Sequence, residues 1–167
     1  LTAINSINWA RLMAQIVYYF WAYLQLEETK VSFIVPSGNF GNIYSARIAK
    51  HMGLPINQLH IATNQNDVLH KIISTGEIKM QSVQQTFSPS MDIQISSNFE
   101  RQIFECLDND SNKLNQIMKI LYDKNSYNFD SNIQKKFQNI YNSSSVSNEK
   151  TLDTIKIFNL KYNYLAD

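Results

Sequence analysis

The residues best suited to chemistry form a glycine-containing turn, Pro36-Ser37-Gly38-Asn39-Phe40-Gly41-Asn42. The turn separates a short β-rich segment from a helical pattern, so N–H groups without intrahelical partners converge there with the positive end of the helix dipole. Such a turn is an anion-binding site. We expect Gly38 and Gly41 to supply positive φ and close approach of the main chain, and Asn39 and Asn42 to add side-chain amide contacts.

The turn does not match two common phosphate motifs. It has no Gly-Lys-Ser/Thr, so the lysine and the magnesium-binding hydroxyl of a nucleoside triphosphatase are missing. The dinucleotide pattern needs a third glycine and an acid at the end of the next strand, where this chain has Thr63-Asn64. The turn therefore suits a single phosphate monoester. Its spacing alone is equally compatible with a turn that uses glycine only to bend.

A second polar region, residues 88–101, has two interpretations. Ser97 followed by Glu100 has the spacing of a capping box at the start of a helix, which needs no ligand. The same region also gathers hydroxyl groups, a helix N-terminus and Arg101, which suits an anion. Capping is the simpler explanation. A similar choice applies to residues 5–9, either a helix start or a polar cluster in a pocket.

Composition excludes several classes of function. The 167-residue chain has 15 basic and 14 acidic residues and a net charge of +1. It therefore has no long-range positive electrostatic field that would attract a nucleic acid. Cys106 is the only cysteine, which fits a reducing, cytoplasmic setting and a small core residue rather than a nucleophile. The three histidines lack zinc-ligand spacing, so no metal is expected. The uncharged stretch from Leu12 to Leu26 is too short and too polar to span a membrane.

The elements that position these residues follow the rhythm of a parallel α/β fold. A helix apolar nearly all round, expected to be buried, is predicted before the turn. Buried strands and helices then alternate, which is typical of a parallel sheet covered on both faces. The predicted ranges are 7–24 (helix), 31–35 (strand), 43–52 (helix), 59–63 (strand) and 67–75 (helix).

The character of the sequence changes after Asp108, where Asn, Lys, Ser and Ile dominate and no strand pattern is visible. Helices are predicted over residues 113–123, 132–141 and 148–162, with Asn142-Ser143-Ser144-Ser145 as a polar turn. We therefore expect an α/β part over residues 1–108 and a helical C-terminal appendage over residues 109–167. Because the chain starts at Leu1 inside an apolar pattern, we expect an internal piece of a longer protein.

Three motifs in order resemble threonine synthase, in its bacterial and fungal branch. The matching segments are Asn5-Ser6-Ile7-Asn8-Trp9-Ala10-Arg11 with the helix that follows, Val35 to Asn42, and Ser88 to Ile93 with Ser96 to Arg101. Together they span about residues 3–101, whereas residues 109–167 resemble the family only weakly, through the final Tyr164-Leu165-Ala166-Asp167.

This resemblance implies a fold-type-II pyridoxal-phosphate (PLP) enzyme, a lyase of amino-acid biosynthesis that converts O-phosphohomoserine and water to L-threonine and phosphate. The family's cofactor-phosphate turn carries over to Gly38, Asn39, Phe40, Gly41 and Asn42, although the family more often has Asp at position 42 and Thr at position 37. Substrate contacts are expected at the polar groups of the other motifs, namely Asn5, Ser6, Asn8, Ser97, Asn98 and Arg101.

The family's cofactor-binding lysine lies in a Phe-Lys-Asp context that this chain lacks. The isolated piece is therefore expected to be inactive, and to self-associate through its uncovered apolar helix. Two alternatives remain open, namely another fold-type-II PLP enzyme such as an amino-acid dehydratase, and a non-catalytic remnant that acts as a scaffold.

Overall fold

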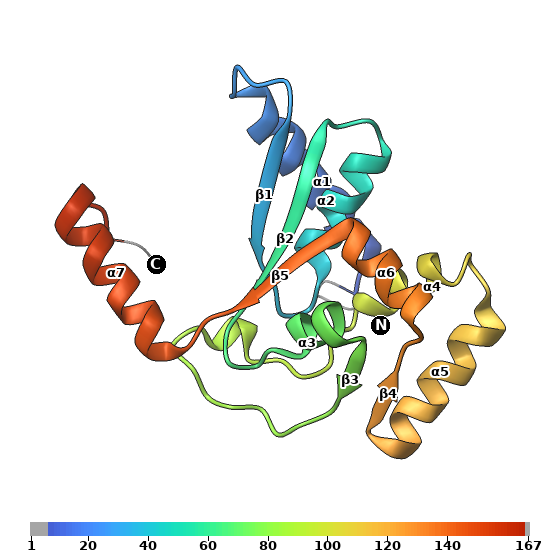
Figure 1. Ribbon diagram of the computed structural model, residues 1–167. Helices are drawn as coiled ribbons and strands as arrows, with labels where there is room; N and C mark the ends of the chain where they lie inside the picture. The colour runs from blue at the N-terminus through green and yellow to red at the C-terminus, as the bar shows by residue number, and fades with distance from the viewer. Residues whose placement is uncertain (1–6, 166–167) are drawn as a thin grey trace.

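A three-stranded parallel sheet lies at the centre of the computed structural model, which describes residues 7–165 (Figure 1). Its strands are β1 (Val31–Pro36), β2 (Ile56–Thr63) and β5 (Tyr141–Ser145), in the order β1-β2-β5. Leu59 in the central strand pairs with Phe33 on one side and Tyr141 on the other. The α/β fold class is therefore confirmed.

The remaining elements surround this sheet. Helices α1 and α2 pack against each other, and α2 makes the crossover that joins β1 to β2 (Figure 1). A short antiparallel pair, β3 (Glu77–Lys79) with β4 (Ser126–Asn128), lies apart from the main sheet. The helices are α1 (Trp9–Leu24), α2 (Gly41–His51), α3 (Val68–Thr75), the 3-10 turn η1 (Pro89–Met91), α4 (Phe99–Cys106), α5 (Ser111–Lys124), α6 (Ser131–Ile140) and α7 (Asn148–Tyr162).

Alternation along β2 produces one buried and one more open face of the sheet. Leu59 and Ile61 are fully buried, because their side chains point into the core on alternate positions of the strand. On the opposite face Ile34 of β1 is 73% exposed. This face is therefore open at Ile34 in the described residues, and its covering in the longer parent stays a prediction. Cys106 is buried in the core, as predicted, and burial raises the pKa of its thiol.

Two strands after Asp108 correct the prediction of a purely helical C-terminal segment. The predicted polar turn is strand β5, whose backbone pairs in parallel with residues 59–63 of β2. Its serine side chains find specific partners: Ser144 Oγ lies 2.8 Å from His60 Nε2 and Ser143 Oγ lies 2.9 Å from His70 Nδ1. Strand propensity depends strongly on such context, which a run of serines does not reveal.

The C-terminal segment also shares the core. Phe137 and Tyr141 are 0% and 1% exposed and belong to the same hydrophobic cluster as β2. A domain division after Asp108 stays a prediction, but the sheet and the core both continue across that residue.

Helix α1 is less buried than its composition predicted. Leu12, Ile16 and Tyr19 face the core, whereas Val17 and Trp21 on its other side are 62% and 64% exposed. This exposed apolar side agrees with the expectation that part of the helix is uncovered. Among residues 7–165 no helix has the length and apolarity needed to cross a membrane.

Candidate anion site at the strand-to-helix turn

The glycine turn leads from the end of β1 into the first residue of α2. Ser37 begins it and is almost completely buried: its N–H donates to the carbonyl of Ala62 at 2.9 Å, and its hydroxyl donates to the carbonyl of Val35 at 2.9 Å. The turn is therefore fixed to the carboxyl end of the sheet, the edge at which open α/β sheets bind ligands.

Two carbonyl groups of the turn accept hydrogen bonds from the segment that precedes α4. The hydroxyl of Ser96 donates to the carbonyl of Gly38. Asn98 donates twice to the carbonyl of Asn39, from its backbone N–H at 3.2 Å and from Nδ2 at 3.1 Å. In a trans peptide the C=O and N–H groups point in opposite directions. These bonds therefore turn the N–H groups of Asn39 and Phe40 away from residues 96–98.

The donors of the turn have no acceptor within the described part of the chain. The N–H groups of residues 38 to 42 donate to no backbone or side-chain atom there, whereas the N–H of Tyr44 already donates to Phe40 at 3.0 Å. Successive unpaired N–H groups at the start of a helix are the arrangement that binds phosphate. The structure thus places the five residues 38–42 in the geometry expected for an anion cradle.

The positive φ predicted for the glycines lies instead on Phe40, at φ 65°. Neither Gly38 nor Gly41 has positive φ, so that prediction is wrong. The left-handed conformation costs an ordinary residue roughly 1–2 kcal/mol. Here it directs the Phe40 ring into the core, where the ring is 1% exposed and lies 4.9 Å from the Phe99 ring and 5.4 Å from that of Tyr141. Aromatic packing thereby offsets the backbone strain.

Gly38 is required for close packing rather than for its dihedral angle. A Cβ at this position would lie 2.9 Å from Ile93 Cδ1, 3.2 Å from Met91 Cα and 3.3 Å from the carbonyl oxygen of Ser90. All three distances are shorter than a normal contact of about 3.5–4.0 Å. The absent side chain therefore lets residues 90–93 lie directly against the turn.

Asn42 is oriented by the first helix. The hydroxyl of Tyr19 donates to Asn42 Oδ1 at 2.7 Å and to the Asn42 carbonyl at 3.1 Å. Burial raises the pKa of Tyr19, which keeps its hydroxyl protonated and able to donate. With its side-chain oxygen occupied, Asn42 has its amide NH₂ left as the group that could donate to an anion, and the expected amide contact stays a prediction.

A hollow of about 420 Å³ opens in front of the turn. Arg11 and Gln15, one helical turn apart on α1, contribute to its wall, and none of the lining residues within 7–165 is acidic. Our sequence analysis did not select Arg11, although its i, i+4 spacing from Gln15 places both on one face of the helix. The lining residues are Arg11, Gln15, Pro36, Ser37, Gly38, Asn39, Phe40, Gly41, Asn42, Ser90 and Met91.

Only part of the second polar region, residues 88–101, contacts the glycine turn or lines the hollow. The predicted capping box is wrong, because Asn98 rather than Ser97 is the N-cap residue of α4. Buried Asn98 instead binds the glycine turn, while Ser97 lines a separate apolar cavity of about 300 Å³ with residues such as Phe99 and Ile103. The structure therefore brings Asn98 to the turn but does not bring Ser97 to the hollow.

Arg101 is a residue of α4 whose side chain contacts the start of α1. Its Nη2 donates to the carbonyl of Ile7 at 3.1 Å, its Nε donates to Asn98 Oδ1 at 3.3 Å, and its guanidinium carbon lies 5.5 Å from the centre of the Trp9 ring. Asn8 is the N-cap of α1 and accepts from the N–H of Ala10 at 3.0 Å. The other two predicted substrate contacts, Asn5 and Ser6, lie outside the described residues.

Fold and site together define an α/β protein with a parallel sheet and a strand-to-helix turn whose N–H groups have no acceptor in the described chain. No family model matches the chain. It is 41% identical over 157 residues to threonine synthase of Pseudomonas aeruginosa, covering 93% of this chain and 34% of that protein. For the Saccharomyces cerevisiae enzyme the identity is 43% over 168 residues, covering 92% and 33%.

The structural comparison agrees. The chain superimposes on PLP-bound threonine synthase from Brucella melitensis with a TM-score of 0.96 and 44% identity, covering 100% of this chain and 36% of that one. The sequence and fold of the chain therefore match a segment of threonine synthase, as the three motifs predicted. The chain spans about a third of the length of the curated relatives it matches.

Proposed function

We propose that this chain is part of a threonine synthase, and that its glycine turn binds the phosphate group of pyridoxal phosphate. The reaction would be the conversion of O-phosphohomoserine and water to L-threonine and phosphate. The observation that carries the proposal is the set of N–H groups from Gly38 to Asn42, which have no acceptor in the described chain and belong to residues that line the hollow. The similarity of nearly the whole chain to threonine synthases supports the same conclusion.

The residues of the hollow fit a phosphate dianion. Its lining includes residues 38–42, whose backbone N–H groups have no acceptor in the described chain, the N-terminus of α2 at Gly41, and Arg11, which supplies a positive charge. When bound, the cofactor supplies an electron sink that stabilises carbanions next to the substrate's amino group. The contribution of this chain is to bind and orient the phosphate end, which fixes the cofactor in position.

The predicted substrate residues other than Ser97, which lines the separate apolar cavity, keep their roles as part of this proposal. Asn98 and Arg101 join the glycine turn to the start of α1 through a continuous set of hydrogen bonds. Asn5, Ser6 and Asn8 belong to that same start of the first helix in sequence. We place the phosphorylated substrate between the first helix and the glycine turn.

The cofactor-binding lysine of the proposed enzyme lies outside this chain, since none of its lysines stands in a Phe-Lys-Asp context. We further propose a cytoplasmic enzyme. The exposed apolar side of α1, with Met13, Val17 and Trp21 each at least half exposed, supports self-association of the isolated 167-residue piece.

The test uses the full-length parent protein and its Gly41→Val variant. Wild type should bind PLP and convert O-phosphohomoserine to threonine and phosphate. Because Gly41 is a buried residue where the turn enters α2, a valine there should displace the turn and weaken PLP binding at least about tenfold. Wild type that binds PLP but deaminates hydroxyamino acids would indicate a dehydratase, and wild type that binds no PLP would indicate a non-catalytic remnant. Either result contradicts the proposal.

A further inference from the structure

A polar network around one carboxylate lies beside the anion site but outside the hollow's backbone donors. Asp92 follows η1, and its Oδ1 accepts from Thr86 Oγ1 at 2.7 Å, Asn64 Nδ2 at 2.7 Å and Asn66 Nδ2 at 2.9 Å. Its Oδ2 accepts from the backbone N–H of Thr86 at 2.9 Å. Thr86, Asn64 and Asn66 are all buried, so the carboxylate is the common acceptor of four enclosed donors.

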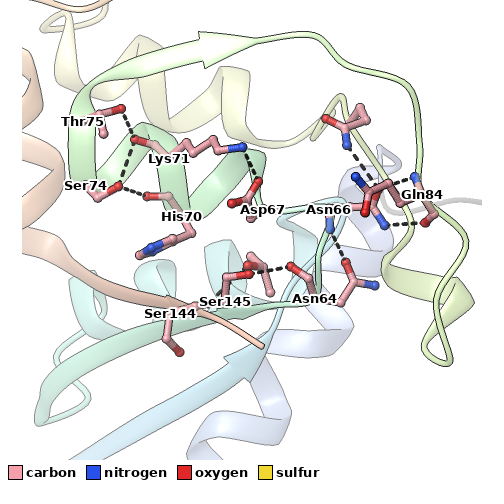
Figure 2. Close-up of polar contacts among 12 residues, drawn as sticks. Asn64, Asn66, Asp67, His70, Lys71, Ser74, Thr75, Gln84, Ser144 and Ser145 are labelled. Carbon is pink, nitrogen blue, oxygen red and sulfur yellow. Dashed lines mark hydrogen bonds and ion pairs between the residues drawn. The ribbon is translucent and has the colours of Figure 1, made fainter. Parts of the chain in front are cut away.

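This network fastens an irregular segment, residues 84–98, to the end of β2. Asn66 Nδ2 donates to the carbonyl of Gln84 at 2.8 Å, and the N–H of Gln84 donates back to Asn66 Oδ1 at 2.8 Å (Figure 2). Asn64 in turn is bound to the neighbouring strand, because Ser145 Oγ donates to its carbonyl at 2.9 Å (Figure 2). The segment contains no regular element before α4 except the single turn η1, so these side-chain bonds define its path.

The same segment makes the contacts that orient the glycine turn. Within six residues of Asp92 lie Ile93, which packs against Gly38, and Ser96 and Asn98, which bind the carbonyls of Gly38 and Asn39. A displacement of residues 84–98 would therefore release both carbonyls at once. The peptides they belong to would then be free to rotate, and their N–H groups would no longer converge.

We propose that Asp92 is a positioning residue for the anion site: its carboxylate fixes residues 84–98 on the end of β2, and through them holds the N–H groups of Asn39 and Phe40 toward the hollow. This inference rests on the proposed function for the identity of the anion. Asp92 itself does not contact the phosphate. It acts through Ser96 and Asn98, whose bonds to the turn it keeps in place.

The hydrogen bonds of this network require an ionised carboxylate at position 92, because such a group only accepts hydrogen bonds. All four groups that face its oxygens are donors, and an ionised carboxylate offers acceptors only. An asparagine of the same shape would present an NH₂ group to at least one of these donors. A buried donor would then lose its acceptor, which is the costly case for a polar group.

The experiment compares Asp92→Asn with wild type in the full-length parent after removal of cofactor. Two readouts are titrations with PLP and with pyridoxal, which lacks the phosphate, and a third is the ³¹P resonance of bound PLP. We expect PLP affinity to fall about tenfold, equivalent to ~1.4 kcal/mol, pyridoxal affinity to stay within twofold, and the ³¹P resonance to shift. Asp108→Asn is the matched control, since the Asp108 side chain is 85% exposed and pairs with Lys136 away from the turn.

A second pair of variants keeps the test decisive if Asp92→Asn does not fold. Thr86→Val removes the hydroxyl that donates to Asp92 while preserving shape, and Thr86→Ser retains it. We expect the valine variant to lose PLP affinity severalfold and the serine variant to resemble wild type. Equal losses for PLP and pyridoxal, or an unchanged PLP affinity and ³¹P resonance in folded Asp92→Asn and Thr86→Val, would overturn the positioning role. Wild type that binds no PLP would instead contradict the proposed function.

Discussion

Gly38→Ala is the smallest change that tests how the anion site is built. Gly38 has no positive φ, so alanine meets no conformational obstacle and the effect is purely steric. The added methyl group would lie 2.9 Å from Ile93 Cδ1 and 3.2 Å from Met91 Cα. Against a normal separation of about 3.5–4.0 Å, either the turn or residues 90–93 must move by a few tenths of an ångström.

The size of the effect follows from which neighbour can move. The end of the Ile93 side chain can rotate, but Met91 Cα and the carbonyl of Ser90 belong to the backbone. That backbone is held by η1 and by the Asp92 network. Overpacking of this kind costs typically ~1–3 kcal/mol. If the turn is the part that yields, PLP affinity falls by about 5-fold to 150-fold, with tenfold for each ~1.4 kcal/mol.

The assay is PLP titration of the full-length parent, with urea unfolding of each variant as the measure of folding. Ile93→Val in the Gly38→Ala background removes the nearest clashing atom and should restore part of the affinity. Gly53→Ala is the control: Gly53 has φ +104° with no atom within 4 Å of an added Cβ, so alanine should lower stability but leave PLP affinity unchanged. Wild-type affinity in folded Gly38→Ala would refute the close-packing argument.

Three further outcomes are expected. Arg101→Ala should weaken O-phosphohomoserine binding and turnover in the parent, because Arg101 connects Asn98 to the start of α1; unchanged kinetics in a folded variant would make it a structural residue only. The isolated 167-residue chain, mixed with PLP and reduced with borohydride, should show no stoichiometric lysine adduct by mass spectrometry, and a single specific adduct would contradict this. Hydrogen bonds, first that from the Thr86 side chain, hold the pKa of Asp92 below its ordinary 3.8, so its stabilisation is present above that pH and lost as pH falls toward the lower folded value. Urea unfolding should therefore show a steeper loss of stability below pH 3.8 in wild type than in Asp92→Asn, and equal slopes would contradict it.

Local patterns were sufficient for most of the elements and for the site's location. Helices α2, α3, α5 and α6 lie within two residues of their predicted ends, and α7 spans residues 148–162 as predicted, because apolar periodicity and terminal signals act over a few residues. The position of the turn with unpaired N–H groups was predictable for the same reason, whereas anion binding there stays a prediction. A strand, a glycine turn and a helix in succession are local, and they bring unpaired N–H groups together wherever they occur.

Long-range contacts decided the features that the sequence did not reveal. Residues 141–145 form a strand because their backbone pairs with the edge of β2. Three serines of this strand also form hydrogen bonds with His60, His70 and Asn64. Phe40 adopts positive φ because distant aromatic rings pack around it. Ser97 has a capping spacing, yet Asn98 is the N-cap residue of α4, and its amide binds Asn39, 59 positions earlier in the chain.

By itself, then, the sequence indicated residues 38–42 as a candidate anion cradle, because every backbone donor there comes from one short stretch of the chain. Only the tertiary structure decided how that cradle is held. The bonds from Ser96 and Asn98, the packing of Ile93 on Gly38 and the acceptor role of Asp92 all join residues far apart in sequence. Such contacts depend on side-chain positions in the folded protein, and spacing along the chain carries no record of them.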